Sequence, residues 1–168
     1  TPGEVTGRRW VAGAGPGGPL RYCLPVPTIL LCTDADHVLD EVDAALADDA
    51  TTVYRVRRGI DVLTAIDRLA PDLVMLDEQV GNMGGIATCM AIRNAESVDQ
   101  IPITAVLLLL DRAHDSFQAR RADADGWLVK PLDAVRLREA ATVLLAGEAY
   151  IDPTDPNSGD AADLPVTA

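Results

Sequence analysis

The sequence predicts an α/β fold in which a five-stranded parallel sheet lies between helices, a doubly wound (βα)5 arrangement. Three observations lead to this prediction. Short apolar runs recur along the chain, segments with apolar residues at helical spacing separate them, and aromatic residues are scarce, at 4% against 48% apolar residues. Strands without polar alternation are typical of parallel sheets that are buried on both faces. The 168 residues are enough for one domain with a substantial core.

Five segments are expected to be strands. They are short, and each stops at a polar residue or a loop: Thr28–Cys32, Thr52–Val56, Leu73–Leu76, Ile103–Leu110 and Trp127–Val129. The second segment alternates apolar and polar residues, which predicts a half-buried strand, whereas the third and fourth are continuous apolar runs.

The segments between the strands are expected to be helices. Four of them repeat apolar residues every three or four positions, and the fourth in order is a short charged helix: 38–46, 60–69, 86–95, 112–122 and 135–144. Asp133 stands where a helix N-cap is expected, and Gly147 stands where the last helix is expected to end.

The two ends of the chain differ in composition from the middle. Residues 1–27 are rich in Gly and Pro, and residues 148–168 are acidic and rich in Pro, so neither shows a sustained apolar stripe. We therefore expect a folded domain over residues 28–147 with an extended arm at each end. The aromatic residues Trp10, Tyr22 and Tyr150 in these arms are either solvated or anchors on the domain or a partner.

Charge and cysteine content exclude several classes of function. The net charge of −12 opposes binding to nucleic acid, which requires clustered Lys and Arg. The three cysteines, Cys23, Cys32 and Cys89, form no close pair, which favours a reducing, cytoplasmic location over a disulfide framework or a zinc site. No apolar run approaches the ~20 residues that a membrane span needs, and no signal peptide is visible.

Candidate site residues follow from the predicted topology. In an open parallel sheet, the functional crevice lies at the carboxyl ends of the strands. Asp34 and Asp77 follow the first and third strands, which neighbour one another in such a sheet, and Lys130 follows the fifth. Two adjacent carboxylates repel unless a cation lies between them, and Mg²⁺ prefers oxygen ligands. Carboxylates, Mg²⁺ and an ammonium group together suit phosphoryl transfer to an aspartate.

Three motifs resemble those of one known family, the response-regulator receiver (CheY-like) domains, which have a flavodoxin-like fold. The stretch ILLCTDADHV resembles the opening strand and paired acids of a receiver, PDLVMLDEQVGNMGG its phosphoacceptor segment, and DADGWLVKPLD its closing segment. Order and spacing agree over roughly residues 28–146. The resemblance implies a signalling role in a two-component system (phosphorelay) rather than an enzyme activity.

The resemblance also assigns individual residues. Asp77 matches the phosphoacceptor, Asp34 the second acid of the metal-binding pair, and Gln79 the position whose backbone carbonyl completes the Mg²⁺ site. Lys130, followed by Pro131 in what is a cis bond in the family, matches the lysine that contacts the phosphoryl group. Trp127 matches the aromatic switch position; we favour a fixed packing or docking role for it.

Two departures from the family pattern weaken the expected switch. Thr33 replaces the first acid of the pair, so the attraction for Mg²⁺ is expected to be weak. The hydroxyl residue at the end of the fourth strand is replaced by Leu107 or Leu108, with Leu108 the expected switch position, and leucine cannot bind a phosphoryl oxygen.

We therefore expect an atypical, stand-alone (orphan) receiver that is phosphorylated on Asp77 and acts through protein contacts. Its partner is then a sensor histidine kinase or a phosphotransfer protein, and its contact face is formed by the fourth helix, fifth strand and fifth helix, as the resemblance implies. The alternative is a degenerate receiver that serves as a constitutive accessory subunit of a larger complex, with its arms bound to the partner. A two-carboxylate hydrolytic enzyme is a third alternative, but the sequence shows neither a cap domain nor the further polar residues it requires.

Overall fold

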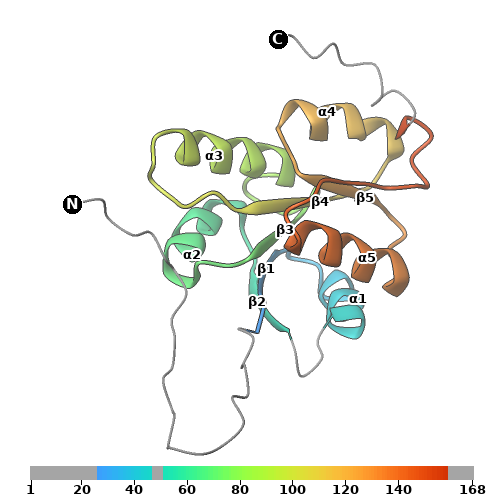
Figure 1. The fold of residues 1–168 in the computed structure, drawn as a ribbon, viewed down its shortest axis with the longest axis horizontal. Helices are drawn as coiled ribbons and strands as arrows, with labels where there is room; N and C mark the ends of the chain where they lie inside the picture. Colours follow the sequence, from blue (N-terminus) through green and yellow to red (C-terminus); the bar gives the residue numbers. More distant parts are fainter. Residues whose placement is uncertain (1–25, 47–50, 159–168) are drawn as a thin grey trace, which may run out of the picture.

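The structure is a computed structural model that describes residues 26–46 and 51–158. Within these residues one parallel sheet has six strands, in the order β2-β1-β3-β4-β5-β6 (Figure 1). Their bounds are β1 Thr28–Cys32, β2 Thr52–Val56, β3 Leu73–Asp77, β4 Ala105–Leu110, β5 Gly126–Val129 and β6 Tyr150–Ile151.

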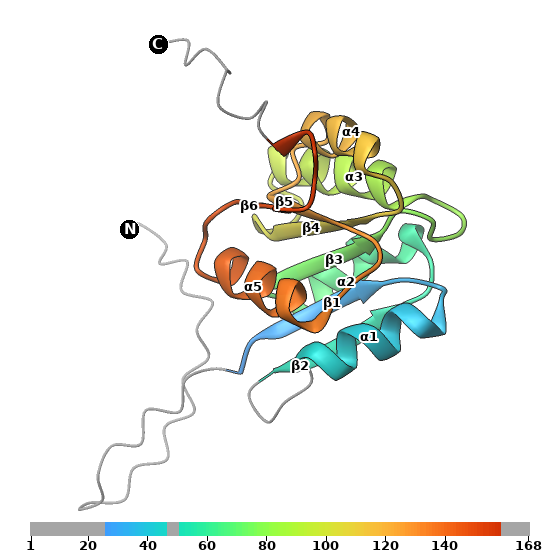
Figure 2. The ribbon, with the colours of Figure 1, turned by 90° about the vertical axis from the view of Figure 1, so that its right-hand side faces the viewer.

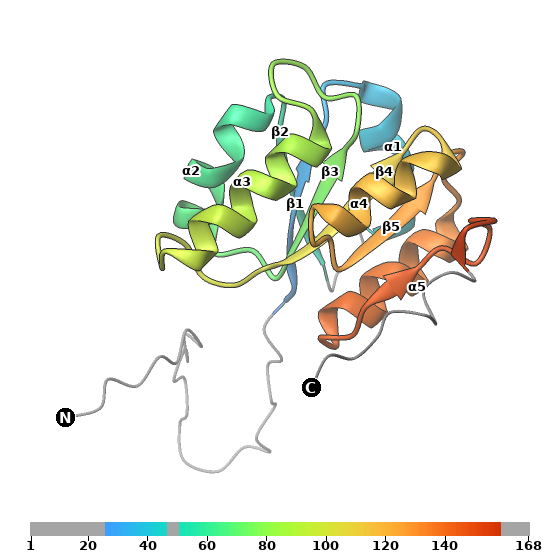
Figure 3. The ribbon, with the colours of Figure 1, turned by 90° about the horizontal axis from the view of Figure 1, so that it is seen from above.

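Helices cover both faces of the sheet, as Figure 2 shows. The helices are α1 Asp36–Leu46, α2 Val62–Leu69, α3 Gly85–Ser97, α4 Ser116–Arg121 and α5 Ala134–Leu145, with short 3-10 turns at Gly59–Asp61 and Ala113–Asp115. Residues of α1 and α5 pack on one face of the sheet, and residues of α2, α3 and α4 pack on the other (Figure 3).

The core consists of two apolar layers, one on each side of the sheet. In β4, Leu108 and Leu110 belong to the layer beneath α2, α3 and α4, whereas Leu107 and Leu109 belong to the layer beneath α1 and α5. A strand that is buried on both faces has no polar position, because successive side chains point to opposite faces. The continuous apolar runs of β1, β3 and β4 therefore reflect burial from both sides.

The predicted fold class is confirmed: the chain forms a doubly wound parallel sheet with alternating strands and helices. The expectation of five strands was one too few, because β6 pairs in parallel with the edge of β5. Tyr150 of β6 is buried and therefore an anchor, and residues 150–158 pack on the domain, although the sequence placed them in an extended arm. The rest of that arm, residues 159–168, and most of the expected N-terminal arm lie outside the described residues, as do Trp10, Tyr22 and Cys23.

Two boundaries bear on the site. The strand expected at Ile103 begins instead at Ala105. The backbone N–H of Thr104 donates to the carboxylate of Glu96 and its hydroxyl to the carbonyl of Pro102, so Thr104 is not part of the strand ladder. Ile103 is consequently 90% exposed. At the start of α5 the expected cap is present, since the carboxylate of Asp133 accepts hydrogen bonds from the backbone N–H groups of Val135 and Arg136.

Candidate functional site

The carboxyl ends of β1, β3 and β5 meet at one edge of the sheet, close to the point where the strand order reverses between β1 and β3. Asp77 is the last residue of β3 and is 1% exposed. Ligands of open α/β sheets bind at this place, because the loops that leave neighbouring strands diverge there. The structure thus puts Asp77 at the position that the topology predicts for a functional residue.

Both carboxylate oxygens of Asp77 are engaged. The Nζ of Lys130 lies 2.7 Å from Oδ1, and the hydroxyl of Thr33 donates to Oδ2 over 2.7 Å. The backbone N–H of Gln79 donates a longer bond to Oδ1, at 3.3 Å. A buried carboxylate requires such partners, since an unpaired charge in the interior is costly. Asp77, Thr33 and Lys130 were all expected to lie together, and the structure brings them into direct contact.

Lys130 bridges two carboxylates. It follows β5 directly, its peptide bond to Pro131 is cis, and its Nζ lies 2.9 Å from Asp111 as well as 2.7 Å from Asp77. Burial by itself lowers the pKa of Lys130, but the hydrogen bonds and charges of Asp77 and Asp111 outweigh burial and hold the pKa above its usual value. The ammonium group therefore stays charged and carries the positive charge of the site.

Asp111 is a site residue that was not predicted from the sequence. It is the first residue after β4, so the rule that nominated Asp34, Asp77 and Lys130 also applies to it. Its backbone N–H donates to the carboxylate of Glu78 over 2.7 Å. Burial raises the pKa of Glu78, and that hydrogen bond opposes the effect only in part. Acidic side chains from the β3 and β4 ends thus surround Lys130.

The expected Mg²⁺ ligands are present in part. Asp34 is exposed, and its carboxylate accepts a hydrogen bond from the backbone N–H of Gly81 over 3.1 Å. Gln79 lies beside Asp77 at the same rim. Among the described residues, no group of three or more His, Cys, Asp or Glu side chains is placed to hold a metal ion. The donors are oxygen atoms, which Mg²⁺ prefers, but Thr33 supplies a hydroxyl where a carboxylate would bind, and that hydroxyl occupies Oδ2 of Asp77. The residues therefore fit Mg²⁺ weakly.

Leu108 does not lie at the end of its strand, contrary to the expectation. β4 continues to Leu110, and the residue opposite Asp77 in the register is Leu109. Leu108 is fully buried in the core, opposite Trp127. The strand was correctly expected to end at Leu110, but four consecutive leucines give no sequence signal for which of them occupies the family's hydroxyl position. No hydroxyl residue is present anywhere in Leu107–Leu110.

Trp127 is held in place. Its indole N–H donates to the buried carboxylate of Asp155 over 3.0 Å, and the guanidinium of Arg120 lies 5.5 Å from the ring centroid. A fixed packing or docking role was expected for Trp127, and this geometry supports fixation. Asp155, which lies 28 residues further along the chain in the supposed arm, had no expected role.

Comparison with known proteins identifies the family. The model of the response regulator receiver domain matches residues 29–142, and the chain belongs to that family. Receiver domains are signalling modules of two-component systems that interact with kinases or phosphotransfer proteins and generally bind Mg²⁺ at the phosphorylation site. In the described residues no helix is long and apolar enough to cross a membrane.

Two curated relatives are DNA-binding or transcriptional regulators. The chain is 29% identical to the DNA-binding dual master transcriptional regulator RpaA of a Synechocystis species, over 71% of this chain and 49% of the relative. It is 30% identical to the transcriptional regulatory protein CseB of Streptomyces avermitilis, over 80% of this chain and 55% of the relative. The chain thus spans about half of the length of these relatives.

Solved structures confirm the fold. The chemotaxis response regulator CheY4 of Vibrio cholerae superposes with a TM-score of 0.61 at 21% identity, over 70% of this chain and 97% of that one. A two-component response regulator of the LuxR family from an Aurantimonas species superposes with a TM-score of 0.69 at 19% identity, over 82% of this chain and 97% of the other.

Proposed function

We propose that this chain is an atypical receiver in which Asp77 accepts a phosphoryl group and whose output passes through protein contacts. The observation that carries the proposal is the ion pair at the strand ends: Lys130 Nζ lies 2.7 Å from the carboxylate of a buried aspartate at the topological switch point. An ammonium at this distance neutralises the aspartate and is in place to bind an oxygen of an incoming phosphoryl group.

In the proposed reaction, a carboxylate oxygen of Asp77 attacks the phosphorus of a phosphohistidine or an acyl phosphate. The bond from phosphorus to the leaving group breaks, the leaving group keeps the electron pair, and an aspartyl phosphate remains. Before the attack, Asp77 must give up its hydrogen bond from Thr33 or loosen its ion pair with Lys130. Mg²⁺, when bound near Asp34 and Asp77, shields the negative charge of the phosphoryl oxygens. With Thr33 in place of an acid, we propose that Mg²⁺ binds weakly and that phosphorylation is slow.

The test is chemical phosphorylation of the purified chain with acetyl phosphate and Mg²⁺. We expect a mass increase of one phosphoryl group that is removed by mild base, and its absence in Asp77→Asn. Asp40→Asn, which changes an exposed acid of α1, is the matched control and should be modified like the wild type. Equal modification of Asp77→Asn, or none of the wild type, would contradict the proposal.

A second candidate function is a constitutive binding module, the accessory-subunit alternative. The observation that favours it is the fixed position of Trp127, which is bonded to Asp155 and lies under Arg120, so that it has no free path as a switch. Affinity capture from native cells separates the two functions. A stoichiometric partner retained equally by wild type and Asp77→Asn supports the module; a partner whose recovery changes with phosphorylation supports the receiver switch.

A further inference from the structure

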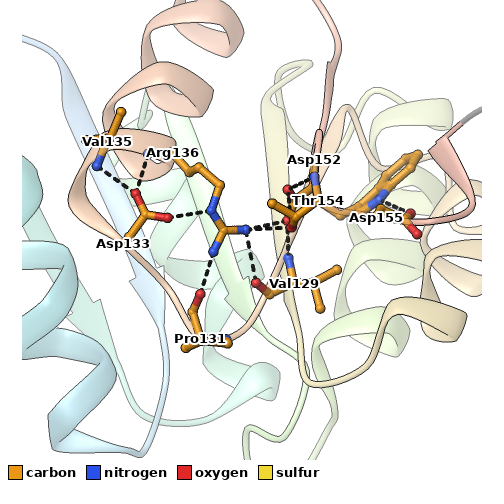
Figure 4. A network of polar contacts seen from close by, with 9 residues as sticks. Val129, Pro131, Asp133, Val135, Arg136, Asp152, Thr154 and Asp155 are labelled. Carbon is orange, nitrogen blue, oxygen red and sulfur yellow. Dashed lines mark hydrogen bonds and ion pairs between the residues drawn. The ribbon is translucent and has the colours of Figure 1, made fainter.

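We infer that residues 150–158 are an intramolecular latch that closes the surface formed by α4, β5 and α5 and holds Trp127 and the Lys130 segment in one conformation. The inference goes beyond the proposed function, because none of the latch contacts involves Asp77. All three parts of the latch contact β5, two of them also reach α5 or the α4 region, and Figure 4 shows the polar centre of these contacts.

The first part is backbone pairing. β6 lies parallel to β5 with Tyr150 opposite Gly126, and the backbone N–H of Tyr150 donates to the carbonyl of Asp125 over 2.9 Å. A Cβ atom at Gly126 would lie 2.7 Å from the carbonyl oxygen of Tyr150, so this close approach requires glycine. An exposed strand edge is a ready site for pairing with another chain. β6 covers that edge of β5 with a segment of the same molecule.

The second part is the carboxylate of Asp152, which is fully buried at 0% exposure. Its Oδ2 accepts a hydrogen bond from the backbone N–H of Val129 and pairs with Arg136, both over 2.7 Å. Its Oδ1 accepts from the backbone and hydroxyl of Thr154, over 2.8 and 2.7 Å. Burial by itself raises the pKa of Asp152, but these hydrogen bonds and Arg136 outweigh it, so the pKa lies below its usual value. The carboxylate is therefore ionised in the latched state and joins β5 to α5.

The third part is Asp155, which is 2% exposed and joins the latch to Trp127. Its second oxygen accepts from the backbone N–H of Asn157 over 2.9 Å. Asn157 in turn reaches the turn before α4 and α4 itself: its side-chain amide donates to the carbonyl of Ala113, and its carbonyl accepts from Arg120. This nine-residue segment thus contacts the α4 region, β5 and α5.

The latch is connected to the candidate site through Arg136. The same guanidinium that pairs with Asp152 donates to the carbonyls of Val129 and Pro131, which flank Lys130 (Figure 4). Loss of the latch therefore removes one support of the segment that carries the Lys130 ammonium. Loss of the latch also exposes the backbone N–H of Val129 and the indole N–H of Trp127, together with the guanidinium groups of Arg120 and Arg136.

These exposed groups define the partner that fits the surface: an extended, acidic segment that adds as a strand to β5 and supplies carboxylates to Trp127 and Arg136. The latch itself has this chemistry. A partner that docks on this face must displace residues 150–158, so the latch competes with such partners.

The test uses the full chain with Asp155→Asn and Asp152→Asn, which keep the side-chain volume and remove the charge. We expect amide hydrogen exchange in residues 126–129 and 150–152 to become at least about tenfold faster, with β1 and β3 unchanged. The indole N–H resonance of Trp127, separated from that of Trp10 by Trp10→Phe, should shift in Asp155→Asn. Glu148→Gln, an exposed acid just before β6, is the matched control and should leave both readouts unchanged.

A second measurement tests displacement directly. A synthetic peptide with the sequence of residues 149–158 should bind Asp155→Asn at least about tenfold more tightly than the wild type, whose own latch competes for the surface. Should Asp152→Asn not fold, Asp155→Asn still tests the latch, since it alters one side chain that contacts only Trp127 and the backbone N–H of Asn157. Unchanged exchange in Asp155→Asn, or equal peptide binding by variant and wild type, overturns the inference. Phosphorylation of Asp77 is not read by either measurement, so failure of the latch is distinguishable from failure of the receiver assignment.

Discussion

At the scale of single residues, Thr33 decides how Asp77 is held. Its hydroxyl is a neutral donor to a buried carboxylate, 2.7 Å from Oδ2. A carboxylate in its place would repel Asp77, and a bound cation or protonation of one of the two acids would relieve that repulsion. Thr33 therefore stabilises the site in the absence of a metal ion. Asp77 does not need Mg²⁺ to balance its charge.

The change Thr33→Asp tests this balance. We expect the Mg²⁺ affinity to rise by about tenfold or more, and the metal-free variant to lose about 1–3 kcal/mol of unfolding free energy, because two buried carboxylates then face each other. Calorimetric Mg²⁺ titration and denaturant unfolding with and without Mg²⁺ measure both effects. Thr33→Asn is the control for side-chain size without charge. Unchanged Mg²⁺ affinity in Thr33→Asp would show that Asp34 and Asp77 do not share a metal site.

At the scale of elements, β4 is a central strand that is buried on both faces. Its leucines contribute to both apolar layers, and Leu108 packs opposite Trp127 with no exposed surface. The family pattern suggested that Leu108 is a lost switch residue. In the structure it is a core residue two positions before the strand end, so a hydroxyl there would face apolar neighbours.

Substitution of Leu108 distinguishes a role as a core residue from a role as a switch residue. Leu108→Thr should lower the free energy of unfolding by about 2–4 kcal/mol, since it leaves a cavity and buries an unpaired hydroxyl. The structural response of the variant to phosphorylation of Asp77 should not be larger than that of the wild type. Leu69→Thr, at a partly exposed position at the end of α2, should cost less than about 1 kcal/mol. Chemical denaturation gives both values; a near-neutral Leu108→Thr that enhances the response to phosphorylation would restore the switch interpretation.

At the scale of the whole molecule, the latch covers the outer edge of β5 with a strand of the same chain. A chain with a net charge of −12 places two aspartates of this segment in buried positions, where Arg136, backbone N–H groups and the indole N–H of Trp127 bind their carboxylates. The acidic composition of the C-terminal segment, which predicts an extended arm, thus coexists with a specific docked structure through Ser158.

This arrangement predicts a dependence of stability on pH. The pKa of Asp152 in the folded chain is lowered from its ordinary value of 3.8, so its stabilising contribution is present above that value and is lost as pH falls through the lower folded pKa. Wild type and Asp152→Asn should therefore differ by about 1–3 kcal/mol in unfolding free energy near pH 6, and the difference should shrink below about pH 4. Urea unfolding of both proteins across this range is the measurement. A constant difference at all pH values would mean that the ionised carboxylate contributes no stability.

The order of strands and helices, and the central residues of the site, were predictable from sequence. Apolar runs without alternation indicate a parallel sheet, and the carboxyl edge of such a sheet is where Asp34, Asp77 and Lys130 are expected. Local signals also predicted the Asp133 cap, because capping depends on neighbours within one turn. The start of β4 was less predictable, since the Ile103-Thr104 pair does not mark where hydrogen bonding between strands begins, whereas its end at Leu110 was expected.

The sequence by itself determined the α/β class, the position of Asp77 at the end of a buried strand and the presence of Thr33 next to Asp34 in place of a second acid, because these depend on local pattern and on the order of elements. Only the tertiary structure decided which polar groups the acids contact. Asp111 reaches Lys130, Asp152 reaches Arg136, and Asp155 reaches Trp127 across 19, 16 and 28 residues of chain. Pairings over such separations follow from how strands register in the sheet and which surfaces become buried. The composition of a polar, proline-rich segment indicates neither its register in a sheet nor the surface that it will cover. The role of this segment as a sixth strand and latch therefore appears only in the folded molecule.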